Sequence, residues 1–316
     1  MAQPANLFDT YDSVGNREDL TDIIYNIDPF DTPFMSMIGT GKAKATFHEW
    51  QTDSLAAASD NKQIEGDEAT NTALTATTRL GNYTQISTKT CQVSGTEEEI
   101  DKAGRQKEMA YQLAKKGKEL RMDMENAMVG INNARVAGNA TTAREIASVT
   151  AWVTTDVNLG TSGASPTGDG TDGRTDGSTQ SAIVEGDLSS LLETMYTNGS
   201  NASVLMAGAF NKRQISGFNG NADEVKHDNT DKRVINAVDV YVGDFHQLKV
   251  VPNRLQRARD VWVLDPSMWE VDFLRPFKQT PLAKTGDSER RMLLVEYTLK
   301  AKNELSSGLI ADCTTS

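Results

Sequence analysis

One short glycine-containing segment resembles a nucleotide-binding loop. In such a loop, backbone N–H groups and a lysine surround a phosphate. The candidate is GTGK, residues 39–42, but the motif requires a glycine at position 36 and a serine or threonine after the lysine. The chain has Ser36 and Ala43 at these positions. The spacing therefore disfavours a nucleotide site.

A second segment carries carboxylates that calcium could use. GDGTDGRTDG, residues 168–177, contains Asp169, Asp172 and Asp176. It lacks the spacing and the terminal glutamate of an EF-hand loop, and it occurs once, whereas calcium-binding β-rolls need repeats. We therefore expect a solvated loop, within a flexible surface stretch at 158–181 that is rich in Gly, Ser, Thr and Asp and has nothing to bury.

The three histidines, His48, His227 and His246, lie in different segments and lack the spacing of paired metal ligands. His48, Glu49 and Trp50 place an acid beside an aromatic ring, as glycosidases do, but no second carboxylate stands out. We predict no catalytic residue, no metal site and no cofactor, and the sequence disfavours an enzyme.

Charge and cysteine content restrict the class of protein further. The net charge of −12 over 316 residues argues against a protein that grips nucleic acid, because such binding depends on Lys and Arg neutralising phosphates. Cys91 and Cys313 have no metal-ligand spacing and are expected to be reduced thiols. No apolar run is long enough to cross a bilayer.

The first 93 residues lack local partners for their apolar side chains. An acidic arm at 1–40 has one short helical candidate at 17–27, followed by DPFDTPFMSMIG, in which we expect the prolines to fix an extended path. Residues 41–93 contain two extended runs around a polar, Ala/Thr-rich middle, which predicts a long hairpin whose tip has no core. Both segments must therefore lie on something else.

One long helix is predicted next. TEEE at 96–99 is a capping box, with Thr96 as N-cap and Glu99 at N3. Beyond it, apolar or small residues recur every three or four positions up to Ile131, which predicts a helix about 50 Å long at ~1.5 Å per residue. The small Gly117 should allow the closest approach of another element.

The remainder of the chain predicts a compact α/β region and then long strands. Asp187 should cap a helix, and strands are expected in SVLMAG, VDVYVGDF, LKVVPNR and VWVLD, with a helix in AFNKRQISGF. Apolar and polar residues alternate at 269–273 and 293–301, which indicates strands with one buried face.

This order of elements resembles the Hong Kong 97 (HK97) type of major capsid protein of tailed bacteriophages. Seven collinear stretches are also similar to the branch typified by the podovirus SU10 capsid protein. They are DPFDTPFMSMIG, EWQTDSL, RLGNYTQISTKTCQVSGT, AGRQKEMAYQL, DMENAM, LAKTGDSERRMLLVEYTL and KNELSSGLI. The resemblance is in register from about residue 22 to 312 and is weakest across 134–181.

The resemblance implies an α+β, HK97-like fold. Its segments are an N-terminal arm at 1–40, an extended loop at 41–93, a peripheral domain at 94–182 and 264–302 with a spine helix at 97–131, and an axial domain at 183–263 and 303–316. The residues that we expect at subunit interfaces are Phe30, Phe34, Met35, Trp50, Glu65, Leu113, Gly117 and Leu120.

The implied function is that of a structural virion protein. Copies would form hexamers and pentamers and then an icosahedral shell that encloses double-stranded DNA without sequence-specific binding. The matching stretches begin near residue 22 and leave no room for the prototype's N-terminal scaffolding domain, so we expect a separate scaffolding protein, with a portal and a decoration protein as further partners. Assembly would take place in the host cytoplasm, without a membrane. Two alternatives stay open here: an encapsulin-type nanocompartment shell, and a carbohydrate-active β-rich hydrolase.

Overall fold

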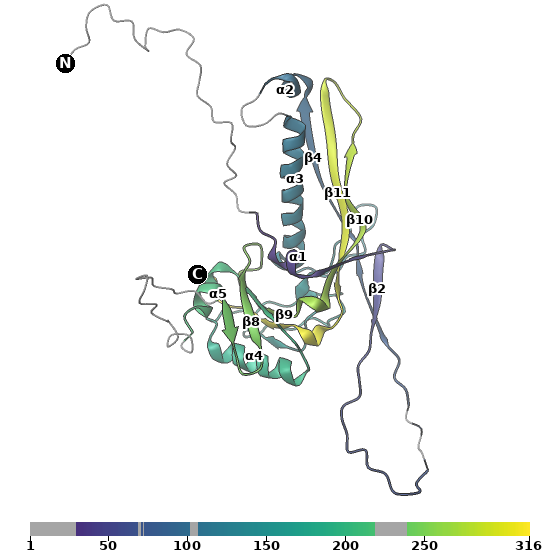
Figure 1. Cartoon of the computed structure of the whole chain (residues 1–316), viewed down its shortest axis with the longest axis vertical. Helices are drawn as coiled ribbons and strands as arrows, with labels where there is room; N and C mark the ends of the chain where they lie inside the picture. The colour runs from purple at the N-terminus through teal and green to yellow at the C-terminus, as the bar shows by residue number, and fades with distance from the viewer. Residues whose placement is uncertain (1–29, 69–70, 72, 102–106, 219–238) are drawn as a thin grey trace, which may run out of the picture.

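The computed structural model describes residues 30–68, 71, 73–101, 107–218 and 239–316. Two sheets meet at a shared core, a long helix rises beside one of them, and a narrow loop leaves the body at the opposite end (Figure 1). The helix predicted at 17–27 and His227 lie outside the described residues.

A four-stranded sheet contains the long strands, in the order β1-β10-β11-β4. Its strands are β1 (Gly39–Lys42), β10 (Trp269–Pro281), β11 (Ser288–Ala301) and β4 (Gln85–Ser94). The apolar face is buried as predicted, since Trp269, Val271, Tyr297 and Leu299 are all buried. The opposite face is not wholly exposed, because its polar residues Asp272, Glu296 and Thr298 are also buried. Since the GTGK segment is strand β1, which runs parallel to β10, it does not form the loop that a phosphate site requires.

A six-stranded sheet has the order β5-β12-β9-β6-β8-β7. Its strands are β5 (Val157–Asn158), β12 (Gly308–Ile310), β9 (Val261–Leu264), β6 (Val204–Ala207), β8 (Gln247–Pro252) and β7 (Val240–Val242). The strands and the second helix predicted for this region are confirmed. The helices are α4 (Glu185–Thr197) and α5 (Ala209–Ile215), and single 3₁₀ turns stand at η2 (Val149–Ala151), η3 (Pro266–Met268) and η4 (Glu304–Ser306).

The start of α4 differs from the prediction by three residues. Val184 is the N-cap, and Asp187 stands at N3. The Asp187 carboxylate accepts a hydrogen bond from the Val184 N–H at 3.4 Å. The acid therefore does help to satisfy the first turn, but from inside the helix.

The single helix predicted from 97 to 131 is wrong. The described residues show α2 (Gly95–Glu99), α3 (Glu108–Glu125) and a π-helical turn, η1 (Asn126–Gly130). Ser94, not Thr96, caps α2, and its hydroxyl accepts from the Glu97 N–H at 3.3 Å. Ile100 is extended (φ −70°, ψ 134°) and ends this helix after one turn. A helix does begin in this segment, but the capping box predicted at Thr96 and Glu99 is wrong, and the helix that Ser94 caps is a short one that follows β4.

Only the C-terminal half of the predicted helix stripe is buried. Leu120 and Met124 are fully buried and Ala127 is nearly so, whereas Leu113 is half-buried and Ile131 is exposed. A Cβ on Gly117 would meet nothing within 4 Å. Among the described residues, none makes the close approach expected at Gly117.

The extended loop is a hairpin for only part of its predicted length. β2 (Phe47–Thr52) and β3 (Thr78–Tyr83) pair antiparallel. The second run does not stay in the hairpin, because β4 begins after Thr84 and pairs with β11 instead. The continuous segment from β3 to β4 therefore contributes strands to two different sheets.

The arm segment ends in a helix, which corrects the extended path expected from its prolines. α1 (Pro33–Met37) begins at Pro33, a residue whose fixed φ suits the first position of a helix. Phe34 is fully buried and makes an edge-to-face contact with Trp269, with ring centroids 6.2 Å apart. Phe34 and Ile38 are thus buried by their own chain, whereas Phe30 stays exposed and Met35 and Met37 are half-buried.

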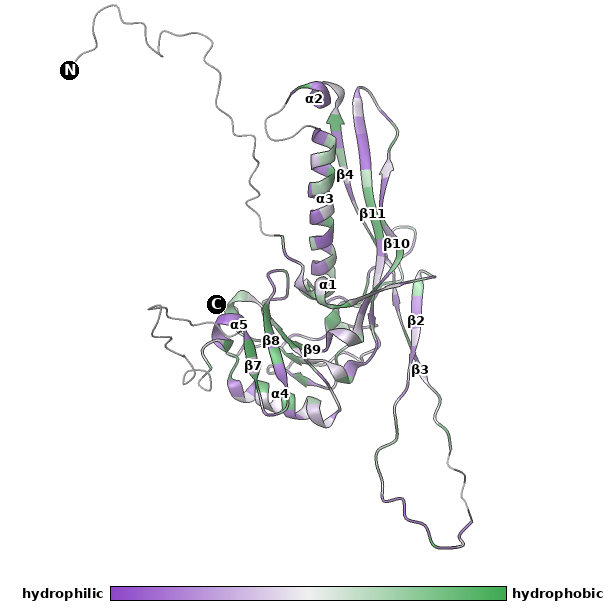
Figure 2. Ribbon diagram, viewed as in Figure 1, coloured by the Kyte–Doolittle hydropathy of each residue, from purple (hydrophilic) through white to green (hydrophobic). Residues whose placement is uncertain are grey.

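Two cores stabilise the body. The first joins the two sheets, since it includes Met206 and Trp262 from the six-stranded sheet, Trp269 from the four-stranded sheet, and Phe34 and Leu120. The second lies between the other face of the six-stranded sheet and α4 with α5. The hydropathy colouring shows apolar residues gathered along the strands that face these cores (Figure 2).

Replacing Phe34 tests this arrangement. Phe34→Ala should lower the free energy of unfolding by about 3–5 kcal/mol, because the substitution leaves a cavity in the shared core. Phe30→Ala is the matched control, since the Phe30 ring is 37% exposed. Urea denaturation of the unassembled subunit measures both variants. Equal losses would show that Phe34 is not a core residue.

Candidate functional site

The loop between β2 and β3 is the largest described segment without cover from the chain itself. Every described residue from 53 to 79 is exposed. Leu55 and Leu74 are each 99% exposed and Ile64 is 80% exposed. Leu55, Ile64 and Leu74 are therefore large apolar side chains that no described residue covers. Glu65, one of the expected interface residues, also lies here and is exposed.

The base of this loop is fixed to the body by contacts that the tip lacks. Trp50 packs against Trp152, with ring centroids 5.4 Å apart. His48 Nε2 lies 2.8 Å from Asp272 Oδ2 on β10. Burial raises the pKa of Asp272, the nearby Glu270 carboxylate raises it further, and His48 acts against both. His48 is therefore a structural link between the loop and the four-stranded sheet, a role that its sequence spacing did not indicate.

The arm is tied to the body at one buried carboxylate. Glu125, fully buried at the end of α3, accepts the backbone N–H groups of Phe34 and Met35 at 2.9 Å each, one on each oxygen. Asn253 Nδ2 donates a third hydrogen bond at 2.8 Å. Burial raises the pKa of the Glu125 carboxyl, although these three donors act in the opposite direction. One side chain thus joins α1, α3 and the segment after β8.

A cluster of buried ion pairs overturns the expectation for residues 158–181. Arg174, whose side chain has no exposed surface, contacts Asp260 Oδ1 at 2.7 Å and Asp312 Oδ1 at 3.2 Å. Arg257 reaches Asp176 Oδ2 at 2.6 Å. The stretch is therefore pinned to the segment before β9 and to the C-terminal residues, and it is not a loop with nothing to bury.

The pKa values of two carboxylates in this cluster are shifted in opposite directions. Burial raises the pKa of Asp260, with Arg174 and Arg257 acting against it. Burial also acts to raise the pKa of Asp312, but the Gly177 N–H, at 2.9 Å from Oδ2, and Arg174 hold it below the usual range. The hydrogen bonds and arginines around Asp312 therefore favour its charged form.

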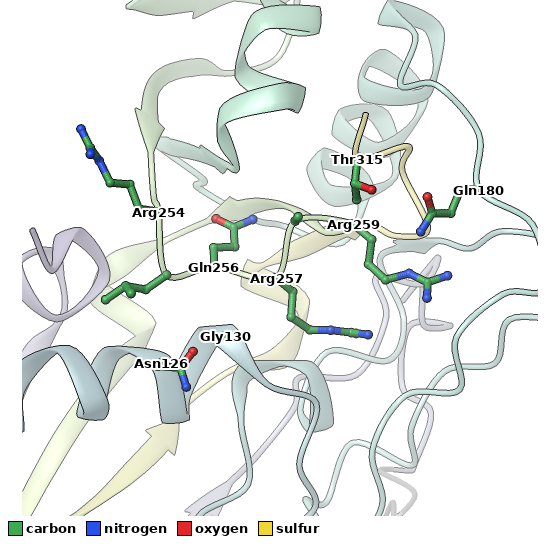
Figure 3. A pocket seen from close by; sticks show the side chains of 10 residues that line it. Asn126, Gly130, Gln180, Arg254, Gln256, Arg257, Arg259 and Thr315 are labelled. Atoms are coloured by element: carbon green, nitrogen blue, oxygen red, sulfur yellow. The ribbon is translucent and has the colours of Figure 1, made fainter. Parts of the chain in front are cut away.

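A hollow of about 450 Å³ lies beside this cluster, and it does not form an anion site. Figure 3 shows Arg257 and Arg259 extending to the same side, with Arg254 turned away from them. Arg257 and Arg259 are both paired with Asp176, at 2.6 and 3.2 Å. Arg257 also contacts Asp260 and Arg259 contacts Asp312, at 3.3 and 2.7 Å, so three arginines, with Arg174, face three carboxylates within the chain.

The candidate metal ligands of the sequence analysis have other partners in the structure. Asp169 accepts hydrogen bonds from the hydroxyls of Thr167 and Thr171, and Asp176 belongs to the arginine cluster. His246 is buried, with Nε2 3.1 Å from the Ser200 carbonyl oxygen. Within the described ranges, no three potential ligands converge on a point that could hold a metal ion. No helix in those ranges has both the length and the apolarity to span a bilayer.

The expected interface residues divide into two groups. Phe34, Trp50 and Leu120 have their side chains covered by their own chain, and Met35 and Leu113 are half-buried. Phe30 and Glu65 are exposed, and Gly117 faces open space. Sequence patterning indicated apolar residues in need of cover without distinguishing cover by the same chain from cover by another. Asp312 and Arg174, which the sequence analysis missed, carry no local pattern because their partners are far apart in the sequence.

Comparison with known proteins identifies the family of this chain. Residues 5–314 match the family described as SU10 major capsid protein. The chain belongs to this family. The chain is therefore a major capsid protein, and its copies assemble into the shell of a phage capsid. The match supports a phage capsid protein over the two alternatives left open above, the encapsulin-type shell and the hydrolase.

Individual relatives agree with the family. The chain is 27% identical to the "Major capsid protein" of Escherichia phage Phieco32, covering 98% of this chain and 97% of the relative. The capsid of Cyanophage A-1(L) is similar in fold, with a TM-score of 0.65 and 13% identity over 97% of this chain and 98% of the other. The capsid of Cyanophage P-SCSP1u gives a TM-score of 0.62 and 10% identity over 99% and 100%. These solved capsids show the HK97-like fold.

Glu125→Gln tests the anchor of the arm. A glutamine offers one acceptor oxygen, so its amide group would face one of the two backbone N–H groups and leave that donor unsatisfied. We expect the free energy of unfolding to fall by about 1–3 kcal/mol. Glu119→Gln, the same change on the surface of α3, should cost only a few tenths, about 0.5 kcal/mol or less. Chemical denaturation followed by circular dichroism measures both, and a cost no larger than the control's would argue against the anchor.

Arg174→Met tests the buried cluster. Removing the guanidinium leaves Asp260 and Asp312 with fewer partners inside the protein, and we expect a loss of about 3–5 kcal/mol. Lys62→Met removes a cation from an ion pair whose side chains are 84% and 72% exposed, and it should leave thermal stability unchanged. If Arg174→Met melts at the wild-type temperature, the cluster does not hold the 158–181 stretch.

Proposed function

We propose that this chain forms hexamers and pentamers of an icosahedral shell that encloses phage double-stranded DNA, with the 47–83 loop of each copy covered by a neighbour. The observation that carries the proposal is the uncovered loop. Its base is packed and its described tip residues are all exposed, including apolar Leu55 and Leu74. A contact in which one copy's loop lies on the next copy is heterologous, and such contacts close into rings when the rotation closes.

The two sheets support a division of each subunit into two domains. We assign β10 and β11 with α2 and α3 to a peripheral domain, at 94–182 and 264–302, and most of the six-stranded sheet to an axial domain, at 183–263 and 303–316. Strands β1 and β4, which complete the four-stranded sheet, come from the arm and loop segments. The loop at 41–93 and the arm at 1–40 complete the subunit. The shared core argues that the two domains move as one body, because Trp262 and Trp269 belong to the same apolar cluster.

The charge of the chain supports a container and not a nucleic-acid grip. With a net charge of −12, the chain holds DNA by enclosure, without sequence-specific contacts and without catalysis. A separate scaffolding protein, a portal and a decoration protein are the partners that we propose, with assembly in the host cytoplasm. Particle assembly in the presence and absence of co-expressed scaffolding protein tests the first of these partners.

Shortening the loop tests the proposal. Replacing residues 53–77 by Asn-Gly, which joins two antiparallel strands directly, removes the tip and keeps β2 and β3. We expect a subunit that folds with wild-type thermal stability but forms no shells by sedimentation and negative-stain microscopy, because the contact between neighbours is lost. Normal shells from the shortened chain would contradict the proposed role of the loop.

A further inference from the structure

Two carboxylates of β10 lie close together against the edge strand β1. Glu270 and Asp272 are two residues apart on β10, so their side chains point to the same face of the sheet. A Cβ on Gly41 of β1 would overlap Asp272 Oδ1 and Glu270 Oε1, so both carboxylates lie against this glycine. Lys42, the next residue of β1, points to the opposite face. Like charges this close disfavour each other unless cations stand beside them.

The nearby cations are divided unevenly between the two carboxylates. Lys302 and Lys300, at the end of β11, have their Nζ atoms 3.3 and 3.5 Å from Glu270 Oε2. Among the described residues, the ion pair of Asp272 is with His48 of β2, whose Nε2 lies 2.8 Å from Oδ2. The Asp272 side chain is 3% exposed and that of His48 is 18% exposed. The buried carboxylate therefore depends on a side chain that solvent protons can reach.

The contact between His48 and Asp272 depends on charge more than on direction. The Nε2 atom of His48 is buried and makes no well-directed hydrogen bond, although the oxygen is only 2.8 Å away. A neutral imidazole in this orientation offers the carboxylate little, whereas an imidazolium attracts it by its charge. An unperturbed imidazole changes its charge at about pH 6.5. The strength of the contact should therefore change with pH near neutrality.

The other charged groups around this pair already have partners. On the two strands of the loop base, Glu49 of β2 pairs with Arg79 of β3 at 2.7 Å. Lys300 of β11 favours the charged form of Asp272, but its ion pair is with Glu270. His48 is thus the group whose change of charge alters the surroundings of the buried carboxylate.

We propose that His48 is a proton-dependent latch, which holds the loop base on the four-stranded sheet more firmly at acidic than at alkaline pH. The loop base is β2 and β3, the two strands from which the exposed loop extends. The latch joins β2 to β10 within one chain. The inference therefore concerns the subunit itself and does not rest on the proposed function.

The direction of the pH effect follows from which state binds more protons. Burial raises the pKa of Asp272, and the Glu270 carboxylate raises it further, although His48 and Lys300 act against them. In the released state, water would surround the Asp272 carboxyl, and its pKa would return toward the ordinary range. The latched state thus binds protons more readily and is favoured as pH falls. Rising pH weakens the latch, because the imidazolium is lost while the carboxylate stays charged.

Hydrogen exchange of the loop base in the unassembled subunit tests the latch. Residues 47–52 and 78–83 report on the base, and β9 is the internal reference for the body. Protection factors, corrected for the pH dependence of intrinsic exchange, are compared at about pH 5.5 and pH 8, on either side of the imidazole range. We expect protection of the base to fall about tenfold at the higher pH, the change that a pKa difference of one unit produces. The protection of β9 should not change.

Three histidine variants separate the charge of the latch from other effects. His48→Gln removes the titrating ring and should give low protection of the base at both pH values. His48→Lys carries a positive charge at both and should keep the base protected at both. His246→Gln, the matched control, changes a histidine between β7 and β8 and should retain the wild-type pH dependence of the base. Circular dichroism melts verify that each variant folds.

Several outcomes would overturn the latch. Wild-type protection of the base that is equal at the two pH values would do so, as would a fall of the same size in His48→Gln. Loss of protection in His48→Lys at the higher pH would show that charge at this position does not hold the base. A parallel loss in β9 would show that the whole body loosens. A failure to form shells would concern the proposed function alone, because this measurement requires no assembly.

Discussion

The constraint on which this subunit depends is that no described residue covers the tip of its extended loop. Leu55 and Leu74 are 99% exposed, while the base of the same loop is packed through Trp50 and held by His48 on Asp272. A loop that is fixed at its base and uncovered at its tip places apolar surface in water at a defined position. The proposed contact with another copy would remove that surface from water, which is favourable in proportion to the apolar area buried. The unassembled subunit is therefore stable in its body and incomplete at its loop.

The body is built so that this position is well defined. A single apolar cluster runs from Phe34 through α3 to both sheets, so the arm, the helix and the strands cannot shift independently. Glu125 adds direction to this packing, because its two oxygens accept two successive N–H groups of α1. Arg174 does the same for the segment between η2 and α4, through Asp260 and Asp312. Buried polar groups of this kind are costly unless they are fully paired, and here the pairing joins parts of the chain that are distant in sequence.

What could be predicted from the sequence was governed by local pattern. Alternation along β10 and β11 gave the long strands, and the lack of local partners in the loop correctly indicated an uncovered tip. Pattern failed where tertiary contacts decided the outcome. The stripe of apolar residues suggested a continuous helix, but the backbone is extended at Ile100. Pro33 begins a helix, and Glu125 accepts the first backbone N–H group of that helix, from Phe34. The stretch at 158–181 looked like a solvated loop because composition alone does not show that Arg174 meets Asp260 and Asp312.

The central claim is that the tip of the loop is covered only by assembly. Hydrogen–deuterium exchange of residues 53–68, measured by mass spectrometry on free subunits and on purified shells, tests it directly. In the free subunit these amides lie on an exposed segment and should exchange rapidly. We predict markedly slower exchange for this segment in shells, with little change in β6 and β9 of the buried sheet. Equally rapid exchange in subunits and shells would contradict the account.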